Sequence, residues 1–305
     1  MRGLADRRER LARFGYSLTD SLPVATINVR LACERPECAG IVSAVTHSLK
    51  PYRTNKDGLR GLFSKTAAVT DLRLFQGHDD YLRAVSKETA GKYHRAANKA
   101  RRAGFFVRRI QPGAYAQSLF DIKASKLRRS HGIVPEAVGT GERPQSDNAD
   151  EYKPPTCSEH WRGDWGLFSE SNDRMWGFAS LIRAGNVVLM DHMMCHAAVL
   201  DAGGMKLLHF EIMSALLGRQ DASLAQLDFL VHGAIEDGSM GAADWRRYVH
   251  QRPHAIEMSA LESIDLPCDF DPEAYLSLNP DVRAAGSDPK KHYLRHGMLE
   301  GRPYK

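Results

Sequence analysis

The segment DHMMCH (residues 191–196) holds three side chains that can act as a base toward a reacting group, Asp191, His192 and His196. The apolar run NVVLM precedes it and predicts a strand. On a strand, two histidines four residues apart lie on one face about 13 Å apart, too far to share a metal ion. The segment therefore predicts a base for proton transfer. Glu211, on the helix that follows, and His232, after the next strand, are further candidates.

The five cysteines are odd in number and scattered along the chain. Cys33 and Cys38 lie close together, but no second pair matches them, so we expect no metal site. Unpaired cysteines are typical of a reducing cytoplasm, which we expect to be the location of the protein. No apolar run approaches the ~18–20 residues that span a bilayer, and the N-terminus lacks the apolar core of a secretory signal.

The segment DAGGMKLLHFEIMSALLG (residues 201–218) predicts a helix, and a glycine pair lies near its start. The first turn of a helix presents unpaired N–H groups, and glycine lets an anion approach them closely. Gly203, Gly204, Met205 and Lys206 are therefore the predicted binding residues for an anionic cofactor. An ordinary helix that Asp201 caps, with no ligand, is the alternative.

Overall composition fits a globular protein with a mild excess of positive charge: 305 residues, 43% hydrophobic, net charge +5. The most basic stretch, residues 86–110, predicts a helix from Lys87 to Gly104 and then a strand over 105–110. Few aromatic residues that could stack on bases interleave with its lysines and arginines, so we expect no specific nucleic-acid binding.

The order of predicted elements indicates an α+β fold in three parts. Residues 1–19 predict a basic N-terminal helix, and residues 20–260 a central mixed, mostly antiparallel sheet flanked by helices. Residues 266–305 predict a small all-helical module, because a capping residue precedes a proline at Pro272, Pro280 and Pro289.

Three stretches resemble the GNAT superfamily of acyltransferases, and more closely its Fem-like, CelD-like branch: VSKETAGKYHRAANKARRAGFFVRRI, WGLFSESNDRMWGFASLIRAGNVVLMDHMMCH and GGMKLLHFEIMSALL. The resemblance implies an acyl-CoA donor in a splayed groove of the central sheet, with Gly203 lining it. Leu200 and Met205 depart from the family's cofactor-loop pattern. The donor therefore stays open between acyl-CoA, an acyl carrier protein and an aminoacyl-tRNA.

The tail FDPEAYLSLNPDVRAAGSDPKKHYLRHGMLEGRPY (residues 270–304) resembles a module found beside surface-polysaccharide glycosyltransferases. That resemblance implies polysaccharide-synthesis proteins as partners and a glycan as acceptor. Together the two resemblances predict a bacterial N- or O-acyltransferase that acylates an amine or hydroxyl of a surface-glycan precursor. Two alternatives stay open: a non-catalytic adaptor of polysaccharide machinery with a degenerate acyltransferase fold, and an N-acyl amino acid synthase.

Overall fold

The computed structural model describes residues 2–29, 35, 38–53, 65–111, 114–126, 128–129, 132–133, 152–219, 221–258, 266–267, 269–298 and 300–305. Cys33 and Cys268 lie outside these ranges. The strands are β1 (Val24–Ile27), β2 (Ala67–Asp71), β3 (Phe105–Ile110), β4 (Arg128–Arg129), β5 (Gly132–Ile133), β6 (His160–Ser169), β7 (Asn172–Ala184), β8 (Val187–Cys195), β9 (Phe229–Ala234) and β10 (Arg252–Met258). The longer helices are α1 (Arg2–Ala12), α2 (Ala39–Leu49), α4 (His78–Thr89), α5 (Lys92–Arg102), α6 (Ala116–Ala124), α8 (Gly204–Gly218), α9 (Met240–Tyr248), α10 (Pro272–Leu278), α11 (Pro280–Ala284) and α12 (Pro289–His292). Short helical turns are η2 (Lys50–Tyr52), η3 (Leu72–Leu74), η4 (Ala197–Val199), η5 (Ala222–Leu224) and η6 (Tyr293–Gly297).

Eight strands form one sheet in the order β1-β10-β2-β9-β8-β7-β6-β3. The pairs β1–β10 and β8–β9 are parallel, and the others are antiparallel. The long hairpins β6–β7 and β7–β8 follow directly from the turns that the sequence places between them. The predicted fold, a mixed and mostly antiparallel sheet with flanking helices, is confirmed.

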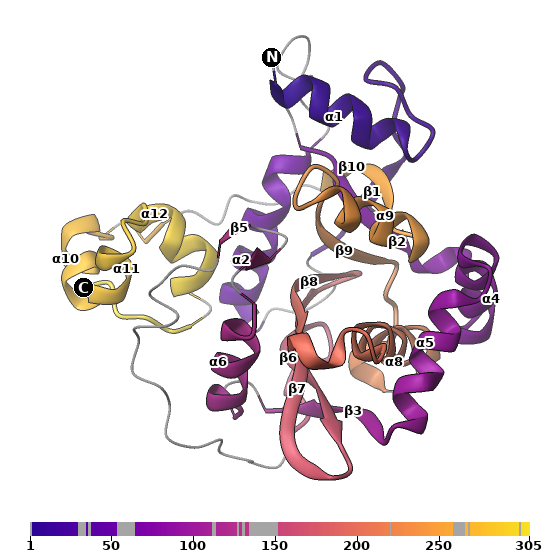
Figure 1. Ribbon diagram of the computed structural model, residues 1–305. Helices are drawn as coiled ribbons and strands as arrows, with labels where there is room; N and C mark the ends of the chain where they lie inside the picture. Colours follow the sequence, from indigo (N-terminus) through magenta and orange to yellow (C-terminus); the bar gives the residue numbers. More distant parts are fainter. Residues whose placement is uncertain are drawn as a thin grey trace.

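Helices cover both faces of the sheet (Figure 1). On one face α4, α5 and α8 bury a core that includes Tyr81, Ala97 and Phe210 against β6, β7 and β8. On the other face α2 packs through Val42, Val45 and Leu49 on the strands at the β1 end of the sheet, and α6 packs on β7. The two cores are separate, so each face of the sheet is stabilised by its own helices.

The basic segment differs from the single helix that its composition predicts. It lies in two helices, α4 and α5, because Ala90 and Gly91 both take left-handed backbone angles, with φ of 48° and 71°. The two alanines Ala97 and Ala100 are buried, and their small side chains bring α5 close to α8. The strand predicted over residues 105–110 is confirmed as β3.

The two ends of the chain form helices as predicted. In α1, the buried Leu11 anchors the helix, and Arg10 donates to the carbonyl of Gly238. The three helices of the C-terminal module start at the three predicted prolines, and Asp271 and Asp288 cap their helices through side-chain oxygens. The module packs on α2, where Ser43 donates to the carbonyl of Leu294 (Figure 1).

His209 makes the stability of the core depend on pH. It is fully buried on α8, and its Nε2 lies 2.8 Å from the hydroxyl of Tyr81, which itself donates to the carbonyl of Val249. Burial lowers the pKa of His209 to about 3 from its ordinary 6.5. Below pH 6.5 the unfolded chain therefore binds a proton that the folded chain does not bind, and folding loses free energy as the pH falls.

We expect His209→Gln, which cannot gain this charge, to remove part of the acid sensitivity. Between pH 6.5 and pH 4.5 the free energy of unfolding of the unmodified protein should fall by about 1.2 kcal/mol per pH unit more steeply than that of the variant. Urea unfolding of both proteins across this range measures the difference, and other buried histidines cancel because both proteins carry them. Equal slopes would contradict the buried neutral His209.

Candidate active site

A local separation of two strands opens the centre of the sheet. β8 and β9 are parallel and pair only over Val187–Leu189 and Phe229–Val231. Both strands then continue, β8 to Cys195 and β9 to Ala234, without further pairing between them. The connection from β8 to β9 passes through α8, so the first turn of that helix follows the end of β8. The predicted splay in a mixed sheet is therefore present between β8 and β9.

A β-bulge on β8 lies at the point of separation. Ser180 on β7 pairs with His192, but the next residue, Leu181, pairs with Met190. Asp191 is the extra residue and faces no partner on β7. A bulge re-aims side chains and disturbs the backbone ladder locally, and here it does so where the neighbouring strand has already diverged.

The splay contains a cavity of about 580 Å³ on the side of α8 and α9. This volume is in the range of small-molecule sites. Its walls come from both strands, from the start of α8 and from α9. The lining residues are Lys126, Asp191, His192, Met193, Met194, Cys195, Leu200, Met205, His232, Ser239, Gly241, Ala242, Trp245 and Arg246.

A second cavity of about 480 Å³ lies on the side of α2 and shares four lining residues with the first, Asp191, His192, His232 and Arg246. Lys65 and Arg295, the latter from the C-terminal module, add positive charge to its wall. The two cavities thus meet at the residues of the splay. One reactant can approach these residues from each side of the sheet.

Asp191 and His192 form the ionisable pair at this junction. Asp191 Oδ2 lies 3.5 Å from His192 Nε2, and the two side chains are 28% and 56% exposed. A carboxylate this close helps to orient the imidazole ring. The pair is accessible enough to exchange a proton with a bound reactant.

A buried carboxyl lies in the same cross-strand row. The register pairs Asp164 on β6 with Ser180 on β7, and Ser180 in turn with His192. Burial raises the pKa of Asp164, and this outweighs the opposing effects of the Ser180 hydroxyl and the Arg162 guanidinium. Asp164 Oδ1 is buried and has no hydrogen-bond partner among the described residues. Asp164 and Ser180 therefore place two further polar side chains in the cross-strand row that contains His192.

Two other predicted proton carriers lie elsewhere. His196 caps the turn η4, where its Nδ1 accepts from the backbone N–H of Ala198, and its ring packs edge-on against Trp176. Glu211 lies on α8 at a different cavity, beside α4, and forms an ion pair with Arg101 at 2.6 Å. The structure brings Asp191 and His192 together at the splay, and it does not place His196 or Glu211 with them.

Among the four predicted cofactor residues, only Met205 lines the cavity in the splay, within the part of the chain that the structure describes. Gly203 precedes α8 with φ of 92°, and a Cβ there would lie 2.1 Å from the carbonyl oxygen of Ala96. Gly204 is buried against Leu167. Lys206 extends over the rings of Tyr93 and Trp245, and burial lowers its pKa. The glycine pair thus lets α8 pack closely on its neighbours.

Two lining residues, Trp245 and Arg246, carried no signal of their own in the sequence, whereas His232 was a candidate base. His232 on β9 faces the splay and accepts through Nδ1 from Gln251 Nε2 at 3.2 Å. Trp245 and Arg246 come from α9, and Arg246 donates to the carbonyl of Asp237. These residues line the cavity because β9 pairs with β8 and α9 follows β9 in the chain. Only a correct sheet order, with β9 next to β8, could have located them.

Comparisons with known proteins give distant structural likenesses only. No family profile and no curated protein matches the chain. Two solved structures resemble part of it at 13% identity. One is the C-terminal domain (DUF2156) of a putative lysylphosphatidylglycerol synthetase from Agrobacterium fabrum, with a TM-score of 0.38 over 62% of this chain and 57% of that chain. The other is L-PGS from Bacillus licheniformis, with a TM-score of 0.34 over 56% of this chain and 45% of that chain. The chain thus spans about half of each.

These likenesses correct the prediction that the chain is related to the Fem-like, CelD-like branch of the acyltransferases. The predicted relationship to Fem-like and CelD-like acyltransferases is wrong, since the two structures named above are a domain of a putative lysylphosphatidylglycerol synthetase and L-PGS. The glycan acceptor and the polysaccharide-synthesis partners, which the C-terminal tail implied, are not tested by these likenesses and stay predictions. Within the described residues, no helix is both long and apolar enough to cross a membrane.

Proposed function

We propose that this protein is an acyl-group transferase that binds its acyl donor in the cavity between β8 and β9. The observation that carries the proposal is the separation of these parallel strands after three paired residues, with Asp191 and His192 at the opening. Unpaired strand edges offer backbone N–H and C=O groups to an extended ligand, much as a further strand would. A donor with an amide-containing arm fits this arrangement.

The cavity on the side of α8 suits the donor. Met193, Leu200, Met205 and Trp245 give it apolar walls for an acyl chain. The start of α8 adds partial positive charge next to it, which favours an anionic group on the donor. Acyl-CoA meets both requirements, and we propose a CoA thioester as the donor.

The cavity on the side of α2 then serves the acceptor, an amine or a hydroxyl. The acceptor's nitrogen or oxygen attacks the carbonyl carbon of the thioester, while His192, beside Asp191, takes the proton that this atom loses. The carbonyl oxygen gains negative charge, which backbone N–H groups at the bulge can stabilise. The carbon–sulfur bond breaks, and the thiolate leaves and is protonated.

A transfer assay tests the proposal. The purified protein is mixed with acetyl-CoA or a long-chain acyl-CoA and a panel of amines and alcohols, and released thiol and product mass are measured together. We expect one free thiol for each acceptor that gains an acyl group. Thiol release without any acylated product would reduce the activity to thioester hydrolysis and contradict a transferase.

A further inference from the structure

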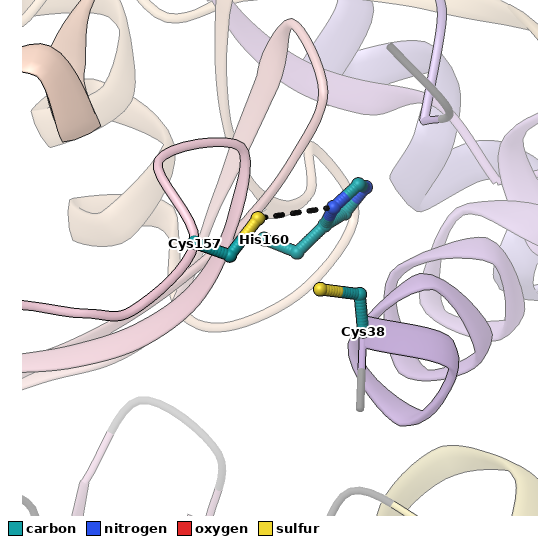
Figure 2. Close-up of side chains that lie close together, drawn as sticks. All are labelled: Cys38, Cys157 and His160. Carbon is teal, nitrogen blue, oxygen red and sulfur yellow. Dashed lines mark hydrogen bonds between the residues drawn. The ribbon is translucent and has the colours of Figure 1, made fainter. Parts of the chain in front are cut away.

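A second cluster of reactive side chains lies away from the splay, at the start of β6. Cys38, Cys157 and His160 are all buried, and their sulfur and ring nitrogen atoms lie within 4.8 Å of one another. Figure 2 shows Cys38 at the start of α2 and the other two at the beginning of β6. His160 pairs with Ala184 at the far end of β7 from the splay. The cluster is therefore separate from the proposed active site.

A hydrogen bond to the backbone sets the orientation of His160. Its Nε2 lies 2.8 Å from the carbonyl oxygen of Val29, and because a carbonyl only accepts, Nε2 carries the proton. In the neutral ring Nδ1 then keeps its lone pair, and this atom faces Cys157 (Figure 2). Histidines that bind metals commonly donate their other ring N–H to a carbonyl in this way.

The distances match those between ligands of a tetrahedral zinc ion. Bonds of about 2.3 Å to sulfur and 2.0–2.1 Å to nitrogen place a sulfur and a nitrogen ligand about 3.6 Å apart, and two sulfur ligands about 3.8 Å apart. Cys157 Sγ and His160 Nδ1 are 3.7 Å apart. The remaining pairs, at no more than 4.8 Å, need to close by about 1 Å at most.

The surroundings favour the thiolate form that a metal requires. Cys38 is the N-cap residue of the eleven-residue helix α2, and a helix N-terminus stabilises a thiolate.

We infer that Cys38, Cys157 and His160 bind a zinc ion. Two thiolates and a neutral imidazole balance the charge of Zn²⁺, and water can complete the tetrahedron, as in other Cys₂His sites. On binding, each thiol loses its proton to solvent, so affinity rises with pH. The ion would join the start of α2 to the start of β6, which lies far along the sequence, and the hydrogen bond from His160 would link it to Val29, the second residue after β1.

Metal analysis of the purified, reduced protein tests this inference. We expect about one zinc per chain, and tetrahedral cobalt spectra with a thiolate charge-transfer band after exchange with Co²⁺. Cys157→Ser and His160→Gln should each weaken zinc binding by 10-fold to 100-fold or more, measured by competition with a chromophoric chelator. Cys195→Ser is the matched control, because Cys195 is equally buried in a different core and should keep full zinc content.

Two results would overturn the inference. One is a reduced, folded protein that takes up neither zinc nor cobalt. The other is full zinc affinity in both Cys157→Ser and His160→Gln. A Cys38–Cys157 disulfide in protein isolated without reductant, combined with no metal uptake after reduction, would assign the cluster to redox chemistry instead. Because neither zinc content nor cobalt spectra depend on acyl transfer, the test is independent of the proposed function.

Discussion

Replacing His192 with alanine is expected to lower the rate of acyl transfer by about 10²–10⁴-fold, the usual contribution of a general base. Its imidazole is the proton acceptor that stands at the junction of the two cavities, next to Asp191. Donor binding should change little, because the side chain is largely exposed at the mouth of the splay. The loss should therefore appear in kcat, with a small effect on KM for the donor.

His196→Asn provides the matched control for this variant. It removes a second imidazole from the same short segment, but asparagine keeps an oxygen that can cap η4 in place of Nδ1. We expect the His196 variant to keep transfer within a few-fold of the unmodified protein. Equal and large losses in both variants would mean that the segment, rather than the His192 imidazole, supports activity. An unchanged rate in His192→Ala would remove this residue as the base.

Gly203→Ala is expected to destabilise the protein by about 2–4 kcal/mol. Its φ of 92° is unfavourable for alanine, and the new Cβ would stand 2.1 Å from the carbonyl oxygen of Ala96. The backbone of α5 would have to move away from α8 to admit the methyl group. Urea unfolding at neutral pH measures this cost.

Gly15→Ala separates the two causes. Gly15 has a similar φ of 82° but nothing lies within 4 Å of the added Cβ, so only the backbone cost of about 1 kcal/mol remains. The difference between the two variants is the contribution of close packing between α5 and α8. If both variants lose the same free energy, the contact with Ala96 does not constrain Gly203.

Local patterns predicted much of the fold. The apolar run before Asp191 correctly indicated a strand, although the spacing of His192 and His196 also suits one face of a helix. Capping residues before prolines located the starts of α10, α11 and α12. These features depend on neighbouring residues, which a sequence displays directly. The break between α4 and α5 was missed because Ala90, a good helix former, adopts a left-handed conformation there.

The site depended on features that a single sequence does not display. The turn after Ala184 sets the register of the β7–β8 hairpin, but the bulge at Asp191 shifts it, so that Ser180 faces His192. His232 joins the site only because β9 lies beside β8 in the sheet order. Cys38 and Cys157 come together in space although 119 positions separate them in the sequence, whereas the sequence pattern suggested only the near neighbour Cys33 as a partner of Cys38.

Calorimetric titration with acetyl-CoA and with a long-chain acyl-CoA tests the central claim most directly. Saturable binding of at least one of them is predicted, with a dissociation constant in the range of about 1 μM–1 mM that is usual for enzyme substrates. Ala242→Trp, which places a large side chain in the cavity wall, should abolish that binding, while Ser214→Trp, at the cavity beside α4, should leave it intact. No binding of either thioester, or equal binding by both tryptophan variants, would contradict a donor site between β8 and β9.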